Sequence, residues 1–177
     1  MMMDSKFNYY QFYTALSNWL NRYPRLITIL RWTNRVVVVT MYVAYLLILA
    51  DVCWRFRSVP LVGLRTVAPL VLIPGFGFFL VSFFRHRLNA PRPYDEWAID
   101  PLISREKHGD SLPSRHAFSA TVISLVAWRV AWPLGVVLLV LTVILGLVRI
   151  IGGVHYPRDI IAGVLCGVIC GACLWLC

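Results

Sequence analysis

The stretch LGVVLLVLTVILGLVRII, residues 134–151, is the part of the chain that decides its fold class. Only one of its residues is charged. A helix that crosses a bilayer needs roughly 20 mostly apolar residues, with a range of about 17–25. Further apolar stretches occupy residues 36–54, 61–84, 116–132 and 160–176. The sequence therefore predicts an all-α fold, a polytopic membrane helix bundle of about five spans.

The overall composition agrees with a membrane protein. Hydrophobic residues make up 59% of the 177 residues and charged residues 14%, whereas soluble domains contain about 45–50% and about 25%. The mean hydropathy of +0.71 is also high. These values exclude a disordered chain, a disulfide-stapled scaffold and an ordinary cytosolic protein. We expect one integral-membrane domain over residues 1–177.

Residues 1–35 differ from the rest because they are rich in aromatic and basic side chains. Aromatic residues crowd positions 7–19, and four arginines follow between positions 22 and 35. This composition is typical of an amphipathic segment that lies in the lipid headgroup region, with a plain basic tail as the alternative. We therefore expect an interfacial segment at 1–35, lying flat as a lateral gate, and a helical core at 36–177.

The charge of the chain points to an anionic partner. There are 17 Lys and Arg residues against 8 Asp and Glu, a formal net charge of +9, and all but two of the cations are arginines. In a soluble protein this balance would suggest nucleic acid. In so apolar a chain it favours anionic headgroups, because arginine binds phosphate oxygens bidentately. The expected partners are membrane lipids and a lipid phosphate substrate, and no nucleic acid.

Four of the five cysteines share one face of an expected helix. Cys166, Cys170, Cys173 and Cys177 are spaced by four, three and four residues. A metal site would need polar groups around its ligands, and none lies nearby in the sequence. The spacing therefore favours a helix–helix seam over a metal or redox site. Glycines at every fourth position of the same stretch indicate close helix packing too.

Alternation of the spans brings several polar residues to one face of the membrane. The second span ends at a polar loop, residues 85–115, the third begins where this loop ends, and the fourth returns to the same side near residue 149. Polar residues at the rim of apolar helices are costly and so point to function. The residues gathered in this way are Arg85, Arg92, Arg149, His116, His155, Ser114 and Asp159. Clustered arginines would repel one another unless a multiply charged anion such as phosphate lay among them.

Two local patterns assign chemistry to these residues. Pro157 suits the first turn of a helix, so that Asp159 can accept a hydrogen bond from one ring nitrogen of His155 and leave the other as a nucleophile. Ser114 is a good N-cap, and the free N–H groups after it form an anion site beside His116, a candidate general acid. Taken one at a time, such residues are more often structural caps or interfacial side chains.

Taken together, the order and spacing of these residues are specific. The sequence contains Arg85-x6-Arg92-Pro93, then Pro113-Ser114-x-His116, then Arg149-x5-His155-x3-Asp159. This set resembles the three motifs of the type 2 phosphatidic acid phosphatase family, Lys-x6-Arg-Pro, Pro-Ser-Gly-His and Ser-Arg-x5-His-x3-Asp. The resemblance covers residues 85–159, and the flanking spans fit in kind only.

The resemblance implies a membrane enzyme that removes phosphate from lipids such as phosphatidic acid, phosphatidylglycerol phosphate or polyprenyl diphosphates. His155 would be the nucleophile that forms a phosphohistidine, Asp159 its orienting partner, and His116 the acid that protonates the leaving group and then activates water. The phosphoryl oxygens would be held by Arg85, Arg92, Arg149, Ser114 and the N–H groups near Arg115. No metal or other cofactor is implied, because the arginines supply the positive charge.

Three positions depart from the family pattern. Arg85 stands where lysine is usual, Arg115 replaces a glycine, and Val148 replaces a serine. The nucleophile and the acid are retained, so these departures bear on the choice of substrate. Only two spans precede the second motif, whereas the common family pattern has three. The N-terminal segment, residues 1–35, is the candidate to take the place of the missing span.

Two other functions compete with a phosphatase. A non-catalytic lipid-phosphate binder or carrier would use the same anion pocket, but it would need the arginines and not an oriented histidine. A vanadium haloperoxidase shares this pocket by resemblance, yet those enzymes are soluble.

The orientation in the membrane has two conflicting indicators. The positive-inside rule places the active site in the cytoplasm, because the basic residues concentrate on its side. Many bacterial relatives, by resemblance, work on the outer face, and arginines that bind substrate distort the charge count. We expect an integral protein of a bacterial plasma membrane with its site on the extracytoplasmic face.

Overall fold

The structure, a computed structural model, describes residues 3–104 and 108–176. These residues form helices and connecting loops, without a strand among them. The helices are α1 (Met3–Asn21), α2 (Pro24–Arg55), α3 (Pro60–Leu88), α4 (Pro93–Glu96), α5 (Arg115–Val130), α6 (Trp132–Ile151) and α7 (Pro157–Ala172), followed by a 3-10 turn at Cys173–Trp175. The expected all-α fold is confirmed.

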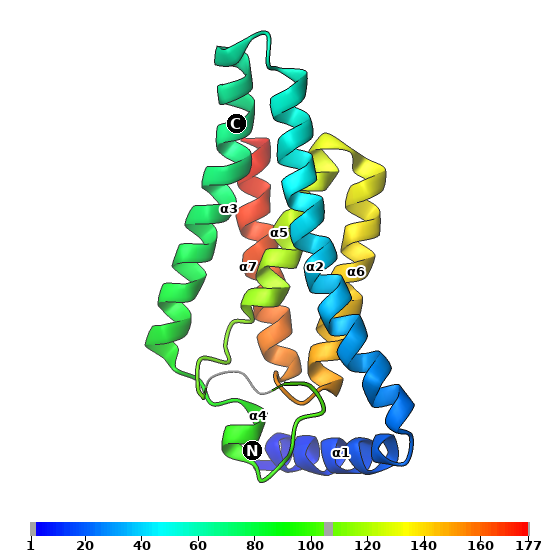
Figure 1. Cartoon of the computed structure of the whole chain (residues 1–177). Helices are drawn as coiled ribbons and strands as arrows, with labels where there is room; N and C mark the ends of the chain where they lie inside the picture. The colour runs from blue at the N-terminus through cyan, green and yellow to red at the C-terminus, as the bar shows by residue number, and fades with distance from the viewer. Residues whose placement is uncertain (1–2, 105–107, 177) are drawn as a thin grey trace.

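Five helices run side by side along the bundle, with α5 among the other four (Figure 1). Four segments are long and apolar enough to cross a membrane: Pro24–Arg55, Pro60–Glu96, Trp132–Ile151 and Pro157–Trp175. The fifth helix, α5, has only 16 residues, about 24 Å at 1.5 Å per residue. Its short length is tolerated because it packs against α2, α3, α6 and α7.

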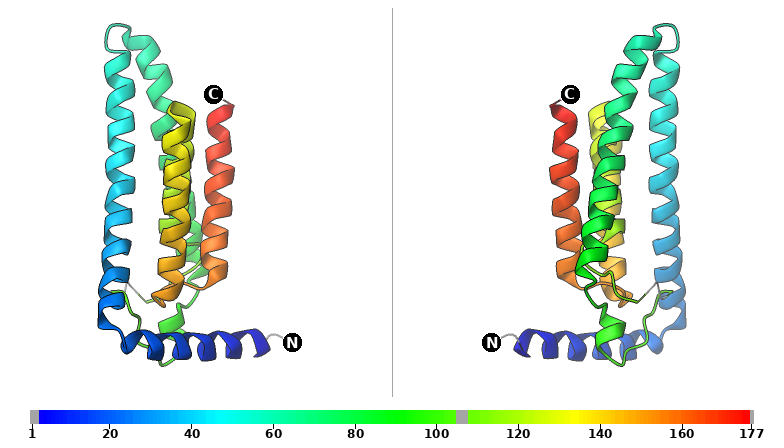
Figure 2. Two further views of the ribbon diagram at one scale, coloured as in Figure 1. Left: turned by 90° about the vertical axis from the view of Figure 1, so that its right-hand side faces the viewer. Right: turned by 90° about the vertical axis from the view of Figure 1, so that its left-hand side faces the viewer.

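Helix α1 lies across one end of the bundle, nearly at right angles to the long helices (Figure 2). Tyr13 and Leu20 on one side of it are buried, while Phe12 and Trp19 are half exposed. This arrangement agrees with the expected interfacial amphipathic segment. Its boundary differs from the expected one, since the segment ends near residue 21 and residues 24–35 begin the long helix α2. Pro24 at the first helical position starts α2, and proline suits that position because its missing N–H has no intrahelical partner to lose.

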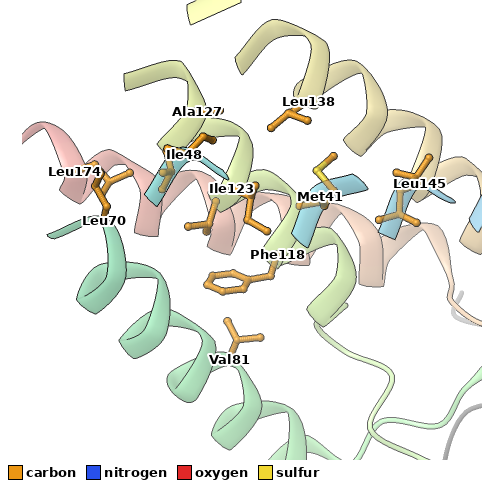
Figure 3. Packing of buried hydrophobic residues seen from close by; sticks show 14 of the residues in the cluster. Met41, Ile48, Leu70, Val81, Phe118, Ile123, Ala127, Leu138, Leu145 and Leu174 are labelled. Carbon is orange, nitrogen blue, oxygen red and sulfur yellow. The ribbon is translucent and has the colours of Figure 1, made fainter. Parts of the chain in front are cut away.

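The apolar core lies along α5, where Phe118, Ile123 and Ala127 face side chains of the surrounding helices (Figure 3). Phe118 packs towards Val81 of α3, and Met41 of α2 lies on the other side. By contrast, large apolar side chains on the outer faces of the bundle are exposed, including Leu46, Leu72, Phe79, Val143 and Ile169. Such an apolar outer surface suits lipid as the surrounding solvent, and the chain is an integral membrane protein.

All the loops that carry the predicted motifs lie at one end of the bundle. This end holds α1, α4, the loop that leads to α5 and the turn between α6 and α7 (Figures 1 and 2). The α2–α3 and α5–α6 turns lie at the opposite end. The alternation of spans thus produces the convergence expected from the sequence.

Candidate active site

Six of the eight residues that the sequence singles out lie together at the end of the bundle covered by α1. Each of the six exposes no more than 3% of its surface. They come from the last turns of α3 and α6, the N-caps of α4 and α5, and the start of α7: Arg85, Arg149, Arg92, Ser114, His155 and Asp159. Helices far apart in the sequence therefore end at one buried polar cluster.

A serine lies between His155 and Asp159. The distance from Nδ1 of His155 to Oδ2 of Asp159 is 3.6 Å, which is too long for a hydrogen bond. Ser111 Oγ donates to that carboxylate oxygen at 2.5 Å and lies 3.3 Å from Nδ1. The Ser111 hydroxyl has one proton, which it donates to Asp159. Its oxygen can therefore only accept from His155, so Nδ1 must carry the proton that it donates to Ser111. We call this chain of two hydrogen bonds the relay. The direct hydrogen bond expected from the sequence is thus replaced by a contact through Ser111.

In this arrangement the other ring nitrogen of His155, Nε2, carries no proton. Nε2 is buried and has no hydrogen-bond partner among the described residues. Burial lowers the pKa of His155 to about 4, against the opposing effect of Asp159. The Arg149 and Arg92 cations reinforce the shift. At neutral pH the imidazole is therefore uncharged, and the Nε2 lone pair can act as a nucleophile.

Three buried arginines make the cluster positive, and two of them are held by loop carbonyls. Arg85 Nη1 donates to the Pro113 carbonyl at 3.5 Å. Arg92 donates through Nε to Gly109 at 2.9 Å and through Nη1 to Val154 at 3.5 Å. Among the described residues only one buried carboxylate accompanies the three guanidinium groups. Guanidinium groups bind phosphate oxygens bidentately, so three of them at one buried cluster suit an anion such as phosphate.

The N-terminus of α5 borders the same cluster. Ser114 caps the helix, since its Oγ accepts the Ala117 N–H at 3.5 Å. Its own N–H donates to the backbone carbonyl of Asp159 at 2.9 Å, which ties α5 to the first turn of α7. The N–H groups of this first turn and the helix dipole favour an anion there.

The two remaining predicted residues lie at the edge of the cluster. Arg115 is exposed, and its guanidinium carbon is 5.8 Å from the centre of the Phe78 ring. Its side chain therefore lies against α3, outside the buried group. His116 is half-buried and borders a small hollow with Met41 of α2 and Leu145 of α6. The roles of phosphate ligand and general acid stay predictions for these two residues.

A family model places the chain among known proteins. The model described as PAP2 superfamily matches residues 66–177, which include all the motif residues. The chain belongs to the PAP2 superfamily. The resemblance to type 2 phosphatidic acid phosphatases is thereby confirmed, and no curated protein matches the chain.

Two solved structures show the same PAP2 membrane fold. The crystal structure of Aquifex aeolicus LpxE has 25% sequence identity and a TM-score of 0.70, and the match covers 94% of each chain. The first transmembrane PAP2 type phosphatidylglycerolphosphate phosphatase from Bacillus subtilis has 18% identity and a TM-score of 0.60, covering 96% of this chain and 94% of that one. Family and fold together support a lipid phosphate phosphatase.

Within this PAP2 site, sequence reasoning missed Ser111. This serine is fully buried and belongs to none of the three motifs. Its only sequence signal is its place shortly before Pro113 and Ser114. Its importance follows from the path of the loop, which brings it between His155 and Asp159.

A second group missed from the sequence holds the loop around Arg92. The Asp95 Oδ2 atom accepts the backbone N–H groups of Gly109 and Arg92 at 2.8 and 3.1 Å. The other oxygen of Asp95 lies 2.5 Å from Nδ1 of His108. No partner for His108 was evident in the sequence. In the structure it contacts Asp95, and Asp95 joins the backbone at Arg92 to the backbone at Gly109.

The structure also bears on the cysteine face and on metal binding. Cys166 and Cys170 border an apolar groove between α3 and α7, and Cys170 Sγ lies 3.4 Å from the Ile73 carbonyl. The contact of Cys170 agrees with a helix seam, whereas Cys173 is exposed and Cys177 lies outside the described residues. Within residues 3–104 and 108–176, no group of three His, Cys, Asp or Glu side chains is arranged to hold a metal ion.

Proposed function

We propose that the protein removes a phosphate group from a membrane lipid through a phosphohistidine at His155. The observation that carries this proposal is the buried imidazole, whose Nδ1 faces Ser111 and whose Nε2 is left without a partner beside three buried arginines. A site that only bound phosphate would need the arginines. It would not need an uncharged, oriented imidazole among them.

In the first step, Nε2 of His155 attacks the phosphorus atom and the P–O bond to the lipid breaks. The phosphoryl group passes to the imidazole, and His116 donates a proton to the departing oxygen, so that the lipid leaves as an alcohol or as the monophosphate of a diphosphate. Asp159 stabilises the imidazolium character that develops on the ring, acting through Ser111. This role explains why a buried carboxylate lies one turn after His155.

In the second step, a water molecule attacks the phosphohistidine. His116, now deprotonated, takes a proton from the water, the P–N bond breaks, and inorganic phosphate is released with the imidazole restored. Arg85, Arg92 and Arg149 stabilise the charge on the phosphoryl oxygens in both steps, together with the Ser114 end of α5. In this scheme no metal ion takes part.

The substrate proposed is a lipid whose phosphate enters the cluster while its tail stays in the membrane. An apolar groove of about 490 Å³ between α3 and α7 is lined by residues such as Leu72, Phe76, Phe84 and Phe118. Phe84 directly precedes Arg85, so that the groove approaches the phosphate cluster. Phosphatidic acid, phosphatidylglycerol phosphate and polyprenyl diphosphates all combine such a tail with such a headgroup.

The decisive experiment measures phosphate release by the purified protein in detergent with EDTA present. The panel contains phosphatidic acid, phosphatidylglycerol phosphate, undecaprenyl phosphate and undecaprenyl diphosphate. We expect metal-independent release from at least one lipid, and its complete loss in His155→Ala. We also expect His116→Ala to accumulate the phosphoenzyme, because its hydrolysis lacks a base.

Two outcomes would count against the proposal. Full activity of His155→Ala would show that another group is the nucleophile. Tight binding of these lipids by the wild-type protein with no phosphate release would favour a lipid-phosphate binder or carrier.

A further inference from the structure

One buried hydroxyl next to the site is not used by the proposed mechanism. It belongs to Tyr9 on α1, and its Oη is shielded from solvent without a hydrogen-bond partner among the described residues. Leaving a hydroxyl buried and unpaired is unfavourable, and native proteins seldom do so without a functional reason. The side chain lies outside the segment matched by the family model, which begins at residue 66.

Tyr9 reaches the site through Tyr156, the residue after the nucleophile. The two rings meet edge to face, with their centres 4.7 Å apart, and the N–H of Tyr156 donates to Oδ2 of Asp159 at 3.0 Å. Burial raises the pKa of Tyr9 above its usual range, and Tyr13 and the Asp159 carboxylate add to the rise. The hydroxyl therefore keeps its proton at neutral pH and can act as a donor near the site.

The neighbours of Tyr9 hold it in place. Tyr13 Oη donates to the Asp100 carbonyl at 3.1 Å, and its ring packs so closely on Gly153 that a Cβ at that position would overlap it. Tyr10 packs on Trp97, with 5.4 Å between ring centres. These contacts of Tyr9, Tyr10 and Tyr13 thus fix this part of α1 on the loops around His155, so that little ordering is needed when a ligand binds.

We propose that the Tyr9 hydroxyl is a substrate contact that donates a hydrogen bond to a phosphate oxygen of the lipid bound at His155. The inference rests on the proposed function for the position of the phosphate. The arginines come from α3, α6 and the loop before α4, whereas Tyr9 comes from α1 and so would supply a donor from a further element. A neutral donor adds a contact without increasing the repulsion among three buried cations.

The test compares Tyr9→Phe with the wild-type full-length protein in detergent. Three quantities are measured: the Tm without ligand, the dissociation constant for inorganic phosphate or orthovanadate, and kcat/KM for the best lipid. We expect oxyanion affinity and kcat/KM to fall about ten- to hundredfold, the range for a hydrogen bond to a charged group. The Tm without ligand stays the same or rises, because the variant no longer buries an unpaired hydroxyl.

Tyr13→Phe is the matched control on the same helix. Its hydroxyl is bonded to the Asp100 carbonyl, so this variant should lower the Tm and leave oxyanion affinity unchanged. Tyr9→Phe that binds the oxyanion as tightly as the wild type overturns the proposal. A fall in Tm as large as that of Tyr13→Phe also overturns it, because the hydroxyl would then support the fold.

The same measurements separate this inference from the proposed function. Weakened oxyanion binding in Tyr9→Phe supports the contact whatever the activity of His155→Ala. Full activity of His155→Ala would instead contradict the phosphohistidine mechanism. Comparing inorganic phosphate with the lipid shows whether Tyr9 contacts the phosphate of the substrate as well as that of the product. A defect with inorganic phosphate but none with any lipid would overturn the substrate contact.

Discussion

At the scale of single residues, the site depends on how His155 is kept uncharged and oriented at once. Burial removes the imidazole from water and lowers its pKa to about 4, so the ring is neutral and nucleophilic under ordinary conditions. Ser111 connects Nδ1 to the Asp159 carboxylate and fixes which nitrogen carries the proton. The lowered pKa alone would not make Nε2 available for attack, because a neutral ring in the other tautomer would present an N–H to the phosphate.

Replacing Ser111 with alanine tests this relay. We expect Ser111→Ala to lower kcat/KM about ten- to hundredfold, since the ring loses its orientation. The pH profile supplies the second readout. The neutral form of His155 is the active one, so on the acid side kcat/KM should fall as the pH drops through about 4. A loss of orientation lowers the maximum of the profile without moving this acid limb upwards.

Structural collapse around Ser111 would give a different profile. If water entered the site, burial would no longer depress the pKa of His155, and the acid limb would move towards the ordinary histidine value of about 6.5. Ser124→Ala is the matched control, because Ser124 is an equally buried serine that bonds the Ala120 carbonyl and Thr142 within the bundle. Equal losses in Ser111→Ala and Ser124→Ala would contradict the relay.

At the scale of helices, the contact between α5 and α7 sets the geometry of the site. Gly163 of α7 lies so close to the start of α5 that a Cβ there would be 2.5 Å from the Ser114 carbonyl oxygen. The Ser114 N–H donates to the Asp159 carbonyl within the same contact. The absence of a side chain at residue 163 therefore lets two parts of the site approach each other.

Gly163→Ala should disturb both stability and activity. The added methyl group must push α7 away from α5, and overpacking of this kind costs about 1–3 kcal/mol. We expect a lower Tm and a lower kcat/KM, measured by thermal unfolding and phosphate release. Gly75→Ala on α3 is the control, because a Cβ there meets nothing within 4 Å. It should leave the Tm unchanged or raise it, since alanine is the better helix former. A Gly163→Ala protein with wild-type Tm and activity would refute this view of the contact.

At the scale of the whole molecule, the bundle presents an apolar belt to lipid and gathers its polar loops at one end. All the buried charged residues described belong to that end, which α1 covers (Figure 1). The arginines of this end include Arg85, Arg92 and Arg149, which we propose bind the substrate phosphate and which would then distort the charge count. For this reason we propose the extracytoplasmic face for the site despite the positive-inside rule.

Cysteine labelling of intact cells tests the orientation. Single cysteines are placed at Ser104, an exposed loop residue at the active-site end, or at Ser58, an exposed residue of the opposite α2–α3 turn. The five native cysteines are replaced by alanine, and retained phosphatase activity shows that the fold is intact. A membrane-impermeant maleimide should label Ser104→Cys and not Ser58→Cys. The reverse pattern would place the site in the cytoplasm.

The fold class and the set of residues gathered at one end could both be predicted from the sequence. Both follow from local properties, since apolar length predicts a span and alternation of spans assigns each loop to a side. Where α1 ends and α2 begins was less evident, because aromatic and basic residues continue through Pro24 into the first turns of α2.

How these residues act together depends on tertiary contacts. Ser111 belongs to no motif, and its place between His155 and Asp159 depends on the path of the loop that carries it. Arg115 lies within a motif, yet its side chain lies against Phe78 outside the cluster. Tyr9 is more than a hundred residues from His155 along the chain, and α1 brings it against Tyr156, the residue that follows His155. Spacing along a helix can be counted in a sequence, whereas contacts between distant segments exist only once those segments have packed.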